Sequence, residues 1–265
     1  MALVLSFIHQ GFQYYHETQD PRTTDLLVVN PPWLPVALVG GYLYFVLSLG
    51  PKLMKDRKPF NLRTLLLVYN VLQVAANAYL SCYGTYLLLS KGWSWSCQPF
   101  DKSTSELAMT EVQLSYYYVL LKLADLIDTV FFVLRKKQSH VSFLHVYHHA
   151  VMVLVPFIFM RNYPTGHCSL LGLLNTYVHA AMYFYFFMTV YRPELVKDVR
   201  WKKYLTMMQM GQFVILAVYF GQPALRGLDC GIPVYWFWLG MGQAVFMLAM
   251  FADFYKKAYL QRKIK

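Results

Sequence analysis

Long apolar blocks, separated by short charged connections, occupy most of this sequence. Each block is close to the roughly 20 residues that an α-helix needs to cross the hydrocarbon core of a bilayer. Because lipid offers the backbone no hydrogen-bond partners, spanning segments of this length favour helices. We therefore predict an all-α polytopic membrane protein with seven transmembrane helices, at about residues 33–50, 64–90, 111–134, 142–160, 168–191, 204–222 and 232–255.

The distribution of basic residues orients these helices in the membrane. Most of the 24 Lys and Arg residues fall in alternate connections, the pattern that marks the cytosolic side. The N-terminus is then lumenal and the C-terminus cytosolic, which agrees with an odd number of crossings. The net charge of +11 is thus interpreted as a topological signal. The basic residues form no stripe with interleaved stacking aromatics, so no nucleic-acid partner is expected.

Short connections indicate a single domain, 1–265, with an N-terminal interfacial segment at 1–30 and a cytosolic tail at 256–265. Within the first of these, Ala2–Tyr15 is expected to lie at the membrane surface as an amphipathic stretch. The ending Arg262–Lys265 resembles a dilysine-type retrieval signal for the endoplasmic reticulum, although an ordinary positive-inside tail explains it equally well.

Three histidines lie inside the fourth apolar block, in the stretch His145-Val146-Tyr147-His148-His149. At 100° per residue their side chains fall within an arc of roughly 100° on one helix face. Titratable rings are costly inside a membrane span, and a helix with only a structural role has no need of them. We therefore predict that His145, His148 and His149 form the centre of a functional site.

Each of the other candidate site residues is polar or charged inside an apolar block: Lys122, Asp125, Asp128, Asn175, His179, Gln209 and Gln212. Lys122 and Asp125, three residues apart, can neutralise each other. Alone, such a pair can be purely structural, and a lone Asn or Gln in a span more often joins helices. From the depths of His148, Asp128 and His179 in their spans, we expect one polar pocket that opens toward the cytosol.

The cysteines divide by location. Cys97 and Cys230 both fall in loops that this topology places in the lumen, where a disulfide is chemically permitted. We predict this pairing, although Cys168 lies near the same face and leaves other pairings open. Cys82 lies in the middle of a span and is expected only to pack.

Histidines in an apolar setting suit two kinds of chemistry. The spacing His-x-x-His-His also occurs in membrane di-iron fatty-acid desaturases and hydroxylases, which gather ligands from several such boxes. This chain has eight His, no second box and no carboxylate-rich partner helix, so we expect no metal, although one zinc ion would suit some of these ligands. The alternative is acyl chemistry, in which a neutral imidazole acts as nucleophile or general base.

Short motifs occur in a fixed order along nearly the whole chain: Arg57-Lys58-Pro59-Phe60, Tyr69-Asn70, Lys122-x-x-Asp125-x-x-Asp128-Thr129, Leu134-Arg-Lys-Lys137, His145-Val-Tyr-His148-His149, Asn175-x-x-x-His179-x-x-Met182-Tyr183 and Thr206-x-x-Gln209-x-x-Gln212. Their joint order resembles that of the fatty-acid elongases of the endoplasmic reticulum. That family consists of 3-ketoacyl-CoA synthases, which condense an acyl-CoA with malonyl-CoA. This sequence departs from the family at Asp125, where Glu is usual, and at Tyr185-Phe186, where paired tyrosines are usual.

The resemblance implies that six of the seven helices surround a substrate tunnel, closed at the lumenal end and open to the cytosol. It further implies a ping-pong reaction in which His148 takes the acyl group from acyl-CoA. Decarboxylation of malonyl-CoA then yields a 3-ketoacyl-CoA two carbons longer. Orientation, proton transfer, oxyanion stabilisation and local charge would fall to His145, His149, His179, Asn175, Gln209, Gln212, Lys122, Asp125 and Asp128.

The same resemblance supplies expectations about partners. Acyl-CoA and malonyl-CoA would be the substrates, with no cofactor. The product would pass to a ketoacyl-CoA reductase, a 3-hydroxyacyl-CoA dehydratase and an enoyl-CoA reductase in the same membrane, and a homodimer is compatible with the sequence. The CoA phosphates would be bound at the basic cytosolic rim, by Arg135, Lys136, Lys137, Lys202 and Lys203.

A proton-coupled transporter is a further alternative, because buried Lys, Asp and His residues can relay protons. The sequence shows neither an inverted repeat nor a pair of Gly- or Pro-broken helices that would favour it. Turnover that needs malonyl-CoA and no transmembrane gradient distinguishes the condensing enzyme from a transporter.

Overall fold

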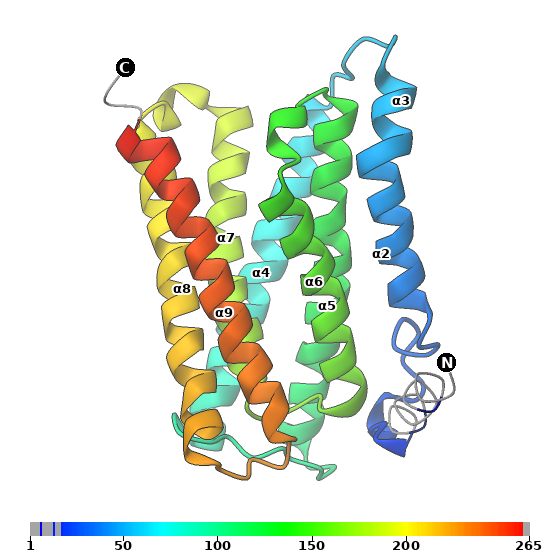
Figure 1. Ribbon diagram of the computed structural model, residues 1–265, viewed down its shortest axis with the longest axis vertical. Coiled ribbons are helices and arrows are strands. Elements are labelled where there is room, and N and C mark those ends of the chain that lie inside the picture. The colour runs from blue at the N-terminus through cyan, green and yellow to red at the C-terminus, as the bar shows by residue number, and fades with distance from the viewer. Residues whose placement is uncertain (1–5, 7–12, 14–16, 262–265) are drawn as a thin grey trace. The chain divides into compact units, whose positions relative to one another are not determined.

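A computed structural model describes residues 6, 13 and 17–261, and in them all long regular elements are helices (Figure 1). The prediction of an all-α protein is thereby confirmed. Two predicted features, the surface stretch Ala2–Tyr15 and the retrieval signal Arg262–Lys265, lie outside the described residues, apart from two isolated positions. The main elements are α2 (Leu34–Tyr44), η2 (Phe45–Leu49), α3 (Gly50–Met54), α4 (Arg63–Lys91), α5 (Glu106–Leu134), α6 (Phe143–Asn162), α7 (Ser169–Tyr191), α8 (Val199–Arg226) and α9 (Val234–Tyr255).

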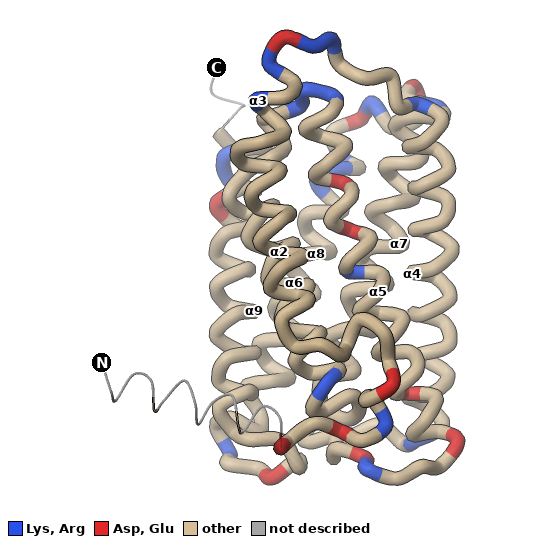
Figure 2. The backbone as a smooth tube through the Cα atoms, turned by 90° about the vertical axis from the view of Figure 1, so that its right-hand side faces the viewer, with Lys and Arg blue, Asp and Glu red and all other residues tan. Residues whose placement is uncertain are grey.

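Six helical segments are long and apolar enough to cross a membrane: Leu34–Met54, Arg63–Lys91, Phe143–Asn162, Ser169–Tyr191, Val199–Arg226 and Val234–Leu260. The remaining predicted span is α5, which at 29 residues is as long as α4 but carries charged residues along its length. Figure 2 shows charged positions gathered near the ends of the helices, and partway along them on α5. The chain is therefore a polytopic membrane protein in which one helix combines spanning length with charge.

Two helices begin before their apolar blocks because polar residues cap them. α5 starts at Glu106, where the Ser105 side chain accepts a hydrogen bond from a backbone N–H at 3.3 Å. α8 starts at Val199, where Asp198 does the same at 2.8 Å. Hydrogen bonds from the backbone N–H and the guanidinium of Arg200 lower the pKa of the Asp198 carboxyl, which keeps this cap ionised at neutral pH.

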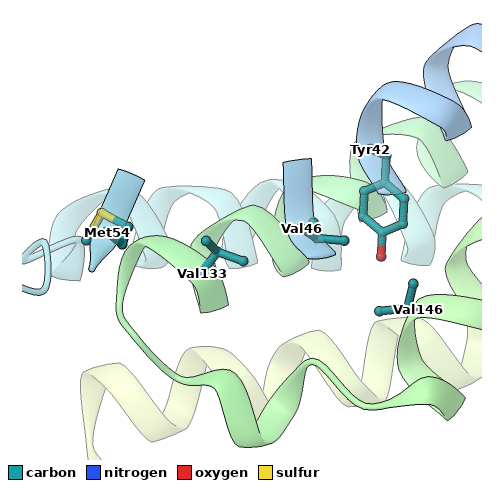
Figure 3. Packing of buried hydrophobic residues seen from close by; sticks show 5 residues of the cluster. All are labelled: Tyr42, Val46, Met54, Val133 and Val146. Carbon is teal, nitrogen blue, oxygen red and sulfur yellow. The ribbon is translucent and has the colours of Figure 1, made fainter. Parts of the chain in front are cut away.

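The described residues group into two compact units, each built from two stretches of sequence; that 1–265 is a single domain stays a prediction. The first unit takes residues from Met1–Pro59 and Lys102–Cys168 and so contains α2, α3, α5 and α6. Its apolar core joins the first span to α5 and α6 (Figure 3), through Tyr42, Val46, Met54, Val133 and Val146.

Close approach between the first span and α5 requires a glycine. A Cβ atom at Gly50 would lie 2.7 Å from the side chain of Val133 and 2.8 Å from the carbonyl oxygen of Phe45, too close for any other residue. Gly50 therefore sets the distance at which α2 and its continuation pack on α5.

A buried arginine anchors the chain that precedes α2 to the end of α6 in this unit. Arg161 is 1% exposed and donates to the backbone oxygen of Val29 and to Oδ1 of Asn30, at 3.4 and 3.3 Å. Its own carbonyl oxygen accepts from the backbone N–H of Asp20 at 2.9 Å. These contacts fix residues 20–30 onto the first unit, at the opposite end of α6 from the histidines.

The second unit takes residues from Phe60–Asp101 and Ser169–Lys265, and in it α4 packs on α7 and α8 packs on α9. Figure 1 shows α8 and α9 side by side along their length. A Cβ atom at Gly240 of α9 would lie 2.9 Å from the ring of Phe220 on α8, so glycine lets these two helices approach closely.

A disulfide between Cys97 and Cys230 joins the segment after α4 to the loop between α8 and α9. Beside it, the backbone N–H of Phe100 donates to the carbonyl oxygen of Cys230 at 2.9 Å. Cys82 and Cys168 are free. Burial raises the pKa of the Cys168 thiol, so that this cysteine stays protonated and unreactive at neutral pH.

Replacing both Cys97 and Cys230 by serine should lower the melting temperature of the purified protein. The two cysteines are 133 residues apart, and cross-links of this kind typically contribute about 2–4 kcal/mol, chiefly by restricting the unfolded chain. Tryptophan fluorescence during heating in detergent measures the effect. The Cys82→Ser variant, which removes an exposed free thiol, is the control and should melt like the wild type; a double variant that also melts like the wild type contradicts the expectation.

Candidate active site

The three histidines of α6 form a continuous row of rings. The helix begins where Ser142 accepts a hydrogen bond from the backbone N–H of His145 at 3.3 Å, so the row lies in the first two turns. The ring centroids of His145 and His149 are 4.2 Å apart, and those of His148 and His149 are 5.7 Å apart. His149 is buried, while His145 and His148 are half-buried. The row, defined as His145, His148 and His149, thus keeps two rings partly accessible beside a buried one.

A hydrogen bond from α5, itself linked to a second bond from α2, holds His145 within the first unit. Its Nε2 lies 2.8 Å from Oγ1 of Thr129 on α5, and that hydroxyl lies 2.9 Å from the phenol oxygen of Tyr42 on α2. The ring of Phe132 contacts His145 edge-on, at 5.5 Å between centroids. This hydrogen bond from α5 comes from Thr129, and the expectation that Asp128 orients a histidine stays a prediction. Tyr42 was missed, because nothing distinguishes it in sequence from the other tyrosines of the chain.

A buried ion pair lies on α5, as the spacing predicts. Lys122 Nζ is 2.6 Å from Asp125 Oδ2, and their side chains are 1% and 3% exposed. Lys122 also lies over the ring of Tyr118, at 5.1 Å from its centroid. Asp128 is buried one turn further along the helix. The first unit therefore combines the histidine row with a lysine whose charge is compensated by a carboxylate.

The second unit contains the predicted pair on α7. Asn175 and His179 are buried, and the ring of His179 contacts that of Tyr183 at 5.8 Å between centroids. Tyr183 in turn meets Tyr69 of α4, with their ring centroids 5.9 Å and their hydroxyl oxygens 3.5 Å apart. His179 is thus at one end of a chain of aromatic contacts that crosses from α7 to α4.

A polar row on α4, defined as Tyr69, Gln73 and Asn77, extends this arrangement and was not predicted. Gln73 Nε2 donates to the phenol oxygen of Tyr69 at 2.9 Å, and Asn77 Nδ2 lies 3.3 Å from Gln73 Oε1. Asn77 is fully buried, and its Oδ1 has no hydrogen-bond partner among the described residues. The sequence did carry a signal, since Gln73 and Asn77 are amides one helical turn apart in an apolar block.

The two glutamines of α8 occupy different settings. Gln209 is half-buried, with its Nε2 3.8 Å from the sulfur of Met182 on α7, while Gln212 is 7% exposed. One turn before Gln209, the Thr206 hydroxyl lies 3.3 Å from that of Tyr259. Gln209 thus belongs to the α7–α8 contact of the second unit.

The basic residues predicted to bind CoA phosphates lie at helix ends. Lys136 has a positive φ of 55°, and its Nζ donates to the carbonyl oxygen of Lys55 at 2.9 Å, which fixes the turn after α5. In the second unit, Lys203 lies over the ring of Tyr255 at 5.8 Å. All five basic residues predicted to bind CoA are half-buried or exposed: Arg135, Lys136, Lys137, Lys202 and Lys203.

The predicted polar pocket combines residues of both units. His148 and Asp128 belong to the first unit, and His179 belongs to the second. The convergence of these three residues stays a prediction. In the part of the chain that the structure describes, no three His, Cys, Asp or Glu side chains are arranged to hold a metal ion.

The sequence matches known proteins over almost its whole length. The family model described as ELO: GNS1/SUR4 family matches residues 27–265. A very long chain fatty acid elongase of Aedes aegypti is 40% identical over 99% of this chain and 73% of the relative. Very long chain fatty acid elongase 7 of Drosophila melanogaster is 39% identical over 97% of this chain and 78% of its own length. Human very long chain fatty acid elongase 1 is 34% identical over 95% of this chain and 90% of its own length.

Proposed function

Because the chain belongs to the ELO (GNS1/SUR4) family of fatty-acid elongation proteins, we propose that it is the condensing enzyme of that process, a very-long-chain 3-oxoacyl-CoA synthase. It joins a long-chain acyl-CoA to malonyl-CoA, with loss of CO₂ and CoA, and forms a 3-ketoacyl-CoA two carbons longer. The observation that carries the proposal is the histidine row, which offers partly accessible imidazoles inside a membrane helix.

In the first half-reaction, a ring nitrogen of His148 attacks the thioester carbonyl of the acyl-CoA. The C–S bond breaks, CoA leaves as a thiol after taking up a proton, and the acyl group is held as an acyl-imidazole. His148 suits this role because it is half-buried and contacts His149, a neighbour able to accept or return the proton. His145 and His149 serve as orienting and proton-transferring groups.

In the second half-reaction, malonyl-CoA loses CO₂, and the resulting enolate attacks the acyl carbonyl. The bond between the acyl carbon and the His148 nitrogen breaks, and the departing nitrogen takes up a proton from solvent or a neighbouring histidine, which restores the imidazole. Hydrogen-bond donors stabilise the oxyanion that forms on the way. We assign this stabilisation to the polar residues expected from the sequence, His179, Asn175, Gln209 and Gln212.

Substrate binding uses the charge at the helix ends. Arg135, Lys136 and Lys137 follow α5, and Lys202 and Lys203 lie in the first turns of α8. Their cations attract the phosphates of CoA, while the acyl chain enters the apolar interior. Neither half-reaction exchanges electrons with an acceptor, so no cofactor is required beyond the two CoA substrates.

Location and partners follow from the reaction. We place the protein in the endoplasmic reticulum membrane because of its similarity to the elongases. The charge asymmetry of its connections favours a lumenal N-terminus and a cytosolic C-terminus. A 3-ketoacyl-CoA becomes an elongated acyl-CoA only after reduction, dehydration and a second reduction. A ketoacyl-CoA reductase, a 3-hydroxyacyl-CoA dehydratase and an enoyl-CoA reductase are therefore its functional partners.

The function is tested with detergent-purified full-length protein, malonyl-CoA labelled in the carbons that are retained, and a ladder of acyl-CoA lengths. Label in a ketoacyl product two carbons longer than the added acyl-CoA is the expected result, and the ladder reports the preferred length. Folded protein that transfers no label from malonyl-CoA with any acyl-CoA overturns the proposal. Activity that instead needs iron and oxygen, or a transmembrane proton gradient, points to the oxygenase or to the transporter.

A further inference from the structure

A hydrogen-bonded chain reaches the histidine row from the first span. It runs from the phenol of Tyr42 on α2 to the hydroxyl of Thr129 on α5, at 2.9 Å, and from there to Nε2 of His145 on α6, at 2.8 Å. All three residues belong to the first unit. A side chain on α2 is thus linked to a histidine that is itself in ring contact with His149.

The hydrogen-bonded chain is shielded from solvent at Tyr42 and Thr129. Thr129 is fully buried and Tyr42 is 7% exposed. In Figure 3 the Tyr42 ring extends from α2 with its oxygen directed toward the side on which Val146 of α6 lies, among the apolar residues of the core. Hydrogen bonds in such surroundings face little competition from water, so they hold their groups in fixed orientations.

Among the described residues, Tyr42 and His145 are the two hydrogen-bond partners of the Thr129 hydroxyl, so its single proton lies in one of these two bonds and the hydrogen-bonded chain has two possible directions. Either Tyr42 donates to Thr129 and Thr129 donates to His145, or both bonds are reversed. A phenol is a stronger acid than an aliphatic alcohol and therefore the better donor. The first direction is favoured, in which Nε2 of His145 is the acceptor and the ring carries its proton on Nδ1.

We infer that Tyr42 is a positioning residue of the active site, acting through Thr129 to fix the tautomer and ring orientation of His145. His145 packs on His149, which contacts His148, so the orientation of one ring is passed along the histidine row. Tyr42 touches no reacting atom in this scheme. The inference deepens the proposed function and rests on it, because it assigns the support of a row whose role is condensation.

The test compares Tyr42→Phe, Thr129→Val, Thr129→Ser and the double variant Tyr42→Phe/Thr129→Val. Phenylalanine keeps the ring in the apolar core and removes only the hydroxyl, and valine has nearly the shape of threonine. Tyr44→Phe is the matched control, because Tyr44 lies on the same helix with its side chain 61% exposed. Each full-length variant is purified in detergent and assayed for kcat and KM with labelled malonyl-CoA.

Loss of the Tyr42 hydroxyl should lower kcat about tenfold, the effect of one orienting hydrogen bond, while KM for the acyl-CoA stays unchanged. Thr129→Val should lower kcat at least as far, and Thr129→Ser should recover most of it because the hydroxyl is retained. The double variant should be no worse than Thr129→Val alone, since Tyr42 acts only through Thr129. A merely structural role for Tyr42 would not produce this pattern.

Several results overturn the inference. The first is a kcat of Tyr42→Phe equal to that of Tyr44→Phe. The second is a change in KM of Tyr42→Phe with no change in its kcat. The third is a loss of kcat in the double variant that equals the sum of the two single losses in activation free energy. If Tyr42→Phe does not fold, the comparison of Thr129→Val with Thr129→Ser tests the inference. Equal kcat values for these two variants would contradict a role for the hydrogen-bonded chain. A wild-type protein that transfers no label from malonyl-CoA refutes the proposed function itself. An active wild type whose kcat does not change in Tyr42→Phe refutes only the inference about Tyr42.

Discussion

Replacing His148 with alanine should abolish condensation, with kcat reduced by about 10⁴-fold or more. A covalent nucleophile has no substitute within its site, and removal of such residues in other acyl-transfer enzymes has effects of about this size. In the wild type, acyl-CoA alone should release CoA in an amount stoichiometric with enzyme, because the first half-reaction needs no malonyl-CoA. His148→Ala should show no such burst, as measured by rapid quantification of free thiol.

The matched control for this variant is His140→Ala. His140 is exposed in the turn between α5 and α6, where its ring stacks on Phe132 and does not belong to the histidine row. Its loss should therefore keep the CoA burst and lower kcat far less than the loss of His148. A normal CoA burst in His148→Ala would move the nucleophile to another histidine of the row, and His145→Ala and His149→Ala would then identify it.

Replacing Lys122 with methionine should lower the free energy of unfolding by about 3–5 kcal/mol, since it removes the cation that compensates the buried carboxylate of Asp125. In a chain of this size the loss corresponds to a fall of roughly 10 °C in melting temperature. The variant should also be inactive, because the uncompensated charge lies on the helix that holds Thr129. Thermal unfolding in detergent and the labelled malonyl-CoA assay measure the two effects.

An exposed ion pair elsewhere in the protein serves as the control for the buried pair of Lys122 and Asp125. Lys257 and Asp253 are also 2.6 Å apart, but their side chains are 67% and 55% exposed, so Lys257→Met should cost less than about 1 kcal/mol. The double variant Lys122→Met/Asp125→Leu should recover most of the lost stability, because it removes both buried charges together. Equal effects of Lys122→Met and Lys257→Met would show that burial does not govern the α5 pair.

The helices and the histidine row could be predicted because their signals are local in sequence. A span needs only an uninterrupted apolar block, and the positions of His145, His148 and His149 follow from helical periodicity alone. The Lys122–Asp125 pair is local in the same sense. Helix starts were less accessible, since Ser105 and Asp198 lie in polar connections that hydropathy does not resolve.

Contacts between helices could not be predicted in the same way. The hydrogen bonds from Tyr42 to Thr129 and on to His145 join three helices and depend on their packing, which no periodicity specifies. The sequence contains 22 tyrosines, and nothing in it predicts which of them contacts the site. The contact of Tyr69 with Tyr183 has the same origin, although Tyr69 lies in a motif shared with the elongases.

The central claim is that the acyl group is held on His148 between the two half-reactions, and intact-protein mass spectrometry with peptide mapping tests it most directly. Purified protein incubated with acyl-CoA should gain the mass of one acyl chain, on the peptide that contains His148. Addition of malonyl-CoA should remove that mass as fast as the ketoacyl-CoA appears. Ketoacyl-CoA that forms while no acylated protein can be trapped, or an acyl group that stays on the protein when malonyl-CoA is added, would contradict the account.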